Sequence, residues 1–136
     1  MAAKDLYSNV KVSRVISPHS PAATGTISGQ VIDTSGFRST VFVLAAGAQT
    51  TTGITVTPIV KSGTATGSLA SCAAAELIGT EAGAALSGTA GANGVKRIGY
   101  QGADRYVTCD LVVTAAATGI YSVTCVQSDA IKGPQS

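Results

Sequence analysis

Apolar residues occupy every second position along much of the chain, a pattern typical of half-buried antiparallel strands. The alternation is clearest in residues 54–60, 105–113 and 120–126. Residues 40–46 are apolar on both faces and indicate a central strand. Pro58 has no N–H for a ladder hydrogen bond, so we expect its segment at a sheet edge or a bulge.

Three further strands are expected near 9–16, 26–32 and 95–100, and the segments between strands are rich in Gly, Asp, Ser and Thr, as turns are. In this interpretation, 26–60 and 95–126 each form a three-stranded meander. About seven short strands at these spacings favour a single antiparallel β-sandwich or small barrel. The sequence therefore predicts an all-β fold.

The connection over 62–94 breaks this rhythm, because it is rich in Gly, Ala and Thr and is longer than most loops of compact domains. Within it, residues 69–78 have the spacing of about two helical turns, with Ser68 as N-cap and Gly79 as a stop signal. We expect one short helix there. The sequence leaves the conformation of 79–94 open, and it fits a flexible crossover as well as a contact loop.

The chain has 136 residues, a length that suits one domain. We expect residues 1–136 to form a single β domain with extended arms at 1–25 and 127–136. Such arms either lie on a neighbouring molecule or fray at the chain ends.

Small residues dominate the composition and shape the expected core. Ala, Thr, Gly and Ser account for 69 of the 136 residues, and there are two Phe, four Tyr and no Trp. A core of Val, Ile, Leu and Ala buries modest area, so we expect a homo-oligomer, in which association adds burial. With 12% charged residues and three cysteines, the chain fits neither a disordered tail, nor a coiled coil, nor a disulfide-stapled mini-protein.

The net charge of +2 is mildly asymmetric along the sequence. Residues 1–70 carry a net +3, residues 71–136 a net −1, and Lys96-Arg97 is an isolated basic pair. A nucleic-acid-binding domain usually has a basic stripe and a pI above about 9. We therefore expect ordinary solvated charges and no direct contact with nucleic acid.

The cysteines and the absence of apolar runs bear on where the protein is made. Cys72, Cys109 and Cys125 form an odd set, and we find neither a signal-like apolar core nor an apolar run of about 18 residues. We expect synthesis in a reducing cytoplasm and no membrane association. Cys109 and Cys125 occupy apolar strand positions, which fits buried free thiols; a disulfide between them across 105–126 stays open.

Catalytic signatures are sparse. His19 is the sole histidine and lies in an extended Ser-Pro-His-Ser-Pro segment, so any Ser–His or Cys–His pair would depend on it. Asp104 and Asp110 flank one strand without indicating an acid–base pair, and the cysteine and histidine spacings match no metal site. The Gly-rich segments 25–29 and 88–94 fit turns better than phosphate loops. We predict no enzyme, and no catalytic, cofactor-binding or metal-binding residues.

Three segments, in order along nearly the whole chain, resemble small and mostly uncharacterised virion structural proteins of tailed bacteriophages and prophages. They are Asp-Leu-Tyr-Ser-Asn-Val-Lys-Val-Ser-Arg-Val-Ile-Ser-Pro at 5–18, Leu-Ile-Gly-Thr-Glu-Ala at 77–82 and Lys-Arg-Ile-Gly-Tyr-Gln-Gly-Ala-Asp-Arg-Tyr-Val at 96–107. The resemblance implies a capsid decoration or minor capsid subunit at the surface of the virion. Its partners would be the major capsid protein or other virion subunits, and it transfers no active-site residues.

Other functions remain open. A tail-tube, collar or head–tail connector component would also be all-β but would form rings. A host- or carbohydrate-binding module would use aromatic side chains on its binding face. The aromatic residues available for this are Tyr7, Tyr100, Tyr106, Tyr121, Phe37 and Phe42.

Overall fold

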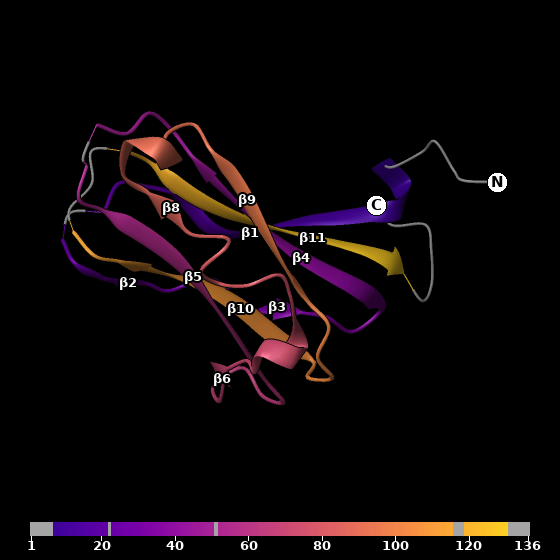
Figure 1. The fold of residues 1–136 in the computed structure, drawn as a ribbon. Helices are drawn as coiled ribbons and strands as arrows, with labels where there is room; N and C mark the ends of the chain where they lie inside the picture. The colour runs from indigo at the N-terminus through magenta and orange to yellow at the C-terminus, as the bar shows by residue number, and fades with distance from the viewer. Residues whose placement is uncertain (1–6, 22, 51, 116–118, 131–136) are drawn as a thin grey trace.

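The computed structural model describes residues 7–21, 23–50, 52–115 and 119–130 as two antiparallel sheets packed face to face (Figure 1). Sheet A has the strand order β1-β11-β4-β9-β7; sheet B has the order β2-β10-β5-β6, with β3 beside β10 and β8 beside β5. The strands are β1 Val10–His19, β2 Gly25–Ile27, β3 Ile32–Asp33, β4 Phe37–Ala46, β5 Thr55–Gly63, β6 Ala70–Ser71, β7 Leu77–Ile78, β8 Leu86–Ser87, β9 Val95–Tyr100, β10 Tyr106–Val113 and β11 Tyr121–Ala130. The expected all-β sandwich is confirmed, and these sheets do not close into a barrel.

The core lies between the two sheets and follows the alternation of the sequence. Alternate residues of β5, β10 and β11 are buried, beginning at Val56, Val107 and Tyr121 respectively. Pro58 lies in β5 between the short pairings with β8 and β6, so its strand is partly an edge strand, as expected. Small aliphatic side chains thus fill a core that contains the single fully buried aromatic ring among the described residues, that of Phe42.

The two expected meanders are wrong, because the strands expected to be neighbours within each meander lie in different sheets. β9 pairs with β4 in sheet A, β10 pairs with β5 in sheet B, and β11 returns to sheet A between β1 and β4. The turn after β9 runs from one sheet to the other, and the amide of Asp104 donates to the Tyr100 hydroxyl at 3.0 Å. Period-two alternation determines which face of a strand is buried, but it carries no information on which strand becomes the neighbour.

The expected helix at 69–78 is also wrong. The segment forms β6, a single 3-10 turn at Ala74–Glu76 (η2) and β7. The amide of Cys72 donates to the carbonyl of Val60 at 2.9 Å, and β7 pairs with β9. Because the edges of β5 and β9 offer these hydrogen bonds, two helical turns, which are marginal alone, do not form. The segment joins the edges of the two sheets.

Much of the expected arms belongs to the domain. β1 occupies Val10–His19 as an edge strand of sheet A, which confirms the strand near 9–16 and contradicts an arm over 1–25. Gln127, expected to begin the C-terminal arm, is 1% exposed, and its amide donates to the carbonyl of Asp33 in β3 at 3.2 Å. Residues 1–6 and 131–136 lie outside the described residues. Figure 1 shows β1, β4 and β11 running past sheet B toward the side where η1 (Tyr7–Asn9) lies.

The remaining part of the crossover, residues 79–94, forms a short strand and a 3-10 turn beside β5. β8 pairs with the start of β5, and a 3-10 turn, η3, follows at Gly88–Gly91. Gly88 has φ +50°, and a side chain there would meet the carbonyl oxygen of Thr52 at 2.7 Å. The region left open by the sequence is therefore packed along the edge of sheet B.

Candidate functional site

His19 lies at the end of β1 and is exposed, opposite Tyr121 of β11. It lines a shallow hollow of about 410 Å³ together with Arg14 and the segment 27–30. The part of the chain that the structure describes contains no group of three His, Cys, Asp or Glu side chains that could hold a metal ion. Nor does any helix within the described ranges have the length and apolar character needed to cross a membrane.

The three cysteines are free thiols. Cys109 and Cys125 belong to β10 and β11, which lie in different sheets and do not form the expected hairpin. Burial raises the pKa of the Cys125 thiol to about 12 and raises the pKa of Cys109 as well. Burial also raises the pKa of the half-buried Cys72. Because the thiolate is the reactive form, these residues act as small apolar side chains of the fold.

Asp110 is buried by a segment that folds over β10. Its side chain, 7% exposed, accepts a hydrogen bond from the amide of Gly29 at 2.8 Å and pairs with Lys61 Nζ at 2.9 Å. A Cβ atom on Gly29 would lie 2.2 Å from the carbonyl oxygen of Cys109, so only glycine permits this approach. Asp110 therefore holds the link between β2 and β3 against the sheet.

Asp104 serves a second, separate cluster. Its carboxylate accepts a hydrogen bond from the Ser62 hydroxyl at 2.8 Å, close to the buried Tyr100. Asp104 and Asp110 thus have different partners. No histidine of the described chain joins the Ser62–Asp104 pair, and nucleophilic catalysis by a serine needs such a base. The cluster fastens the turn after β9 to β5.

Glu81 and Asp33 also bind groups of the fold. Glu81 Oε1 accepts from the amide of Val60 at 2.9 Å, in the gap between β6 and β8 where β5 has no neighbouring strand. Asp33 accepts two hydrogen bonds from Arg105, at 2.8 and 3.0 Å, and these hydrogen bonds lower the pKa of Asp33. The fifth described carboxylate, Glu76, accepts from the amide of Ala73 at 2.9 Å.

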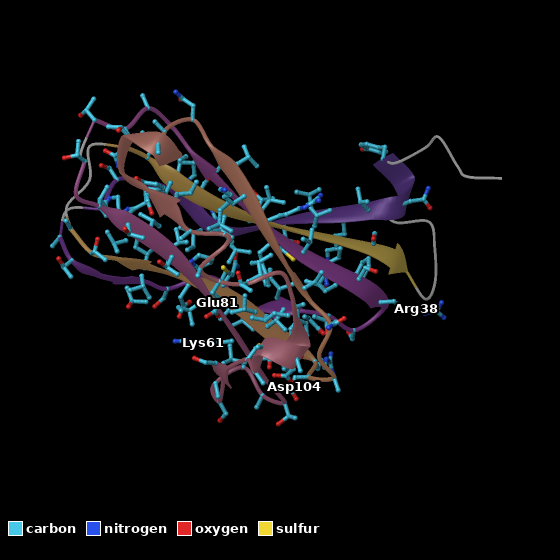
Figure 2. All side chains as sticks on the ribbon, viewed as in Figure 1. Arg38, Lys61, Glu81 and Asp104 are labelled. Carbon is cyan, nitrogen blue, oxygen red and sulfur yellow. The ribbon has the colours of Figure 1, made fainter. Side chains whose placement is uncertain are left out.

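Sheet A carries basic side chains, in contrast to the carboxylates described above. It carries five basic residues, and the two ion pairs among the described side chains, Lys61–Asp110 and Arg105–Asp33, involve none of them. These residues are Lys11 and Arg14 of β1, Arg38 of β4, and Lys96 and Arg97 of β9. The side chains of Lys4, Asp5, Asp129 and Lys132 lie outside the described ones. Figure 2 shows Arg38 at the end of β4, well apart from Lys61, Glu81 and Asp104.

The register of sheet A places two rows of side chains across its outer face. Directly opposed residues of antiparallel strands share a face. One row runs through Val12, Val126, Val41, Gly99 and Ile78, and the ends of this row, Val12 and Ile78, are 62% and 59% exposed. The sheet therefore presents an apolar row that is exposed at its two ends and half-buried at Val41 and Val126.

A second row lies beside the first and runs through Arg14, Thr124, Val43 and Arg97. The row has one guanidinium group at each end, on β1 and β9, with Thr124 and Val43 between them. Together the two rows form a basic, partly apolar face.

A hollow of about 550 Å³ opens on this outer face. Its lining includes the apolar residues Val41, Val126 and Ile78 together with Gly99, and the two cations Arg38 and Arg97. A Cβ atom on Gly99 would lie 3.0 Å from Ile78 Cβ, so glycine lets Ile78 lean over β9. We name this feature, with the two rows, the sheet A face.

Sequence reasoning did not predict the sheet A face. The basic residues of β1 and β9 lie far apart in the chain, and they meet only through β11 and β4. A usable signal was present, since Arg14 and Arg97 both occupy alternating positions of predicted strands. These positions put both residues on one face only if β11 and β4 lie between β1 and β9, an order that the predicted meanders did not contain.

Comparison with known proteins identifies the fold alone. No family model matches the sequence, and no curated protein matches it. Among solved structures, the chain is similar to the SPBc2 prophage-derived protein YomS, with 13% identity and a TM-score of 0.50. The similarity covers 88% of this chain and 92% of YomS.

Proposed function

We propose that this chain is a non-enzymatic structural protein of a tailed-phage virion, a capsid decoration or minor capsid subunit that binds the outer shell. The observation that carries the proposal is the contrast between its two chemistries. All five described carboxylates bind groups within the fold, whereas the outer face of sheet A carries Arg14 and Arg97 beside a partly exposed apolar row. Such a molecule is equipped to bind another macromolecule.

Two resemblances support a phage role. The segments 5–18, 77–82 and 96–107 resemble tailed-phage virion proteins, and the fold resembles that of a prophage-derived protein over most of both chains. Many copies on a capsid lattice would turn weak individual contacts into strong overall attachment. We propose accordingly a homo-oligomer that contacts the major capsid protein or other virion subunits, made in the bacterial cytoplasm, where Cys109 and Cys125 stay reduced.

The alternatives fit the structure less well. In a carbohydrate-binding module, aromatic rings would gather on one exposed face. Tyr7, 88% exposed, is the strongly exposed aromatic residue of the described chain, and Phe42, Tyr100 and Tyr121 are buried in the core. A tail-tube, collar or connector component stays the second candidate, because β1 is an edge strand of the described sheet A and edge strands can pair within a ring.

The test is to find the protein in the particle. We expect mass spectrometry of heads and tails, separated from purified virions of the encoding phage, to detect the chain in heads. Electron microscopy of those heads should place it on the outer shell. Detection in tails with none in heads, or rings of the isolated protein matching a tail or neck layer, would replace the decoration proposal by the second candidate.

A further inference from the structure

We propose that the sheet A face binds an acidic protein surface, with an apolar side chain of the partner in the hollow and flanking carboxylates on Arg38 and Arg97. The binding chemistry is argued from this chain alone. That the partner is a virion subunit rests on the proposed function above.

The spacing of the cations fits a protein element. Arg14 and Arg97 are at the two ends of one row, separated by β11 and β4. Three inter-strand spacings amount to about 14 Å. An α-helix with its side chains is about 10–12 Å across, so a helix or a strand pair fits between these guanidinium groups.

The lining of the hollow requires an apolar partner. Val41 and Val126 are half-buried, and Ile78 is 59% exposed beside Gly99. A purely ionic ligand would leave these side chains in water. A partner that places an apolar side chain against them gains from their burial, while its carboxylates meet Arg38 and Arg97.

Nucleic acid fits this face poorly. Proteins that bind single strands stack bases on exposed aromatic rings. The aromatic residue lining the hollow, Tyr100, is 5% exposed and belongs to the core. Duplex binding relies on phosphate contacts from closely spaced basic residues, whereas here Thr124 and Val43 separate Arg14 from Arg97.

A second copy of this chain is also a poor occupant. Two sheet A faces brought together would oppose like charges, which is unfavourable. The described carboxylates of another copy already bind Lys61, Arg105, Ser62 or backbone amides. The charge on this face therefore favours a different, acidic protein.

The test uses a defined probe. A synthetic amphipathic helical peptide carries leucines on one face, flanked by glutamates, and a matched peptide carries lysines in place of the glutamates. Fluorescence anisotropy measures binding of each labelled peptide, and of a labelled DNA duplex, to the full chain. We expect the glutamate peptide to bind more tightly than both the lysine peptide and the duplex, and added salt to weaken its binding.

The variants separate the hollow from general charge. Arg97→Glu and Arg38→Glu should each weaken binding of the glutamate peptide by about tenfold or more, equal to about 1.4 kcal/mol. Lys96→Glu makes the same charge change on the neighbouring residue of β9, outside the hollow, and should weaken it by less than about threefold. Val41→Thr, which removes apolar lining but keeps the shape, should weaken it severalfold. Circular dichroism melts show which variants are folded.

Each outcome decides the inference. Equal losses for Lys96→Glu and Arg97→Glu, tighter binding of DNA than of the glutamate peptide, or self-association by light scattering that Arg97→Glu abolishes would overturn it. Loss confined to the hollow variants supports it. If the protein is found in heads but the peptide does not bind, this inference fails and the proposed function stands. If the peptide binds but the protein is absent from virions, the inference about the sheet A face stands and the proposed function fails.

Discussion

The five described cations of sheet A and the five described carboxylates of the molecule are used in opposite ways. The carboxylates of Asp33, Glu76, Glu81, Asp104 and Asp110 each accept hydrogen bonds from named groups of the fold. On sheet A, five cations have no carboxylate partner among the described side chains. Glu81 takes the place of a strand partner at the open edge of β5 and the other carboxylates hold turns, links and side chains, whereas Arg14 and Arg97 lie on the outer face of sheet A without such partners in the described chain.

The largest expected effect tests whether the carboxylates stabilise the fold, and it comes from removing the most buried of them, Asp110. Asp110→Ala leaves the amide of Gly29 without an acceptor and Lys61 without its partner, so we expect a loss of about 2–4 kcal/mol in the free energy of unfolding. Urea denaturation measures it. Lys61→Met is the control and should cost less than Asp110→Ala, because Asp110 then keeps its hydrogen bond from the amide of Gly29. Equal costs for both variants would show that the ion pair, rather than the Gly29 hydrogen bond, matters.

Removing Glu81 tests whether a side chain substitutes for a strand. In Glu81→Ala the amide of Val60 loses its acceptor at the open edge of β5, and we expect a loss of about 1–2 kcal/mol. Glu81→Gln keeps an acceptor oxygen and should recover roughly half of this. Hydrogen exchange of the Val60 amide provides an independent measurement, and exchange as slow as in the unchanged protein would contradict the assigned role.

Acid sensitivity should come partly from Asp33. Its hydrogen bonds with Arg105 hold its pKa below the ordinary value of 3.8, so this carboxylate stabilises the fold above that pH and loses its contribution as pH falls through the folded-state pKa. Asp33→Asn should therefore lower stability slightly at neutral pH and reduce the further loss on acidification. Because both side chains are largely solvated, we expect a smaller effect than that of Glu81→Ala. Urea midpoints at neutral pH and at about pH 3 make the comparison.

The smallest change in stability is expected on the sheet A face. Arg14→Ala and Arg97→Ala remove charges that hold no described carboxylate, so the free energy of unfolding should change by less than about 0.5 kcal/mol. A loss above about 1 kcal/mol in urea denaturation would show that these cations support the fold and would weaken the division between the two regions.

Alternation of apolar residues was sufficient to predict the long strands, but not the two-residue strands β6, β7 and β8. It placed β9 at its exact bounds and identified the buried positions of β5 and β10. It failed for Asp110, which alternates with apolar residues as in a half-buried strand but is covered by Gly29. Burial of the outer face of β10 depends on contacts between distant segments, which no local pattern records.

The candidate site depended still more on tertiary structure. Each half of the sequence contains both basic and acidic residues. Folding separates many of them, because β1 and β9 join sheet A, whereas Asp33 and Asp104 bind groups of sheet B and its turns. The helix expected at 69–78 failed for a related reason. Open edges of two sheets supplied hydrogen bonds that local propensity could not anticipate.

The position of β11 has a consequence for synthesis. β11 is the last of the described strands to be synthesised, yet it lies between β1 and β4, so these two strands of sheet A stay unconnected until β11 has emerged. Pairings between segments so distant in sequence form slowly. We therefore expect sheet A to form only after β11 has left the ribosome, and truncation before Tyr121 to leave β1 without the strand it pairs with in the described chain. The fold thereby restricts assembly to chains that include β11.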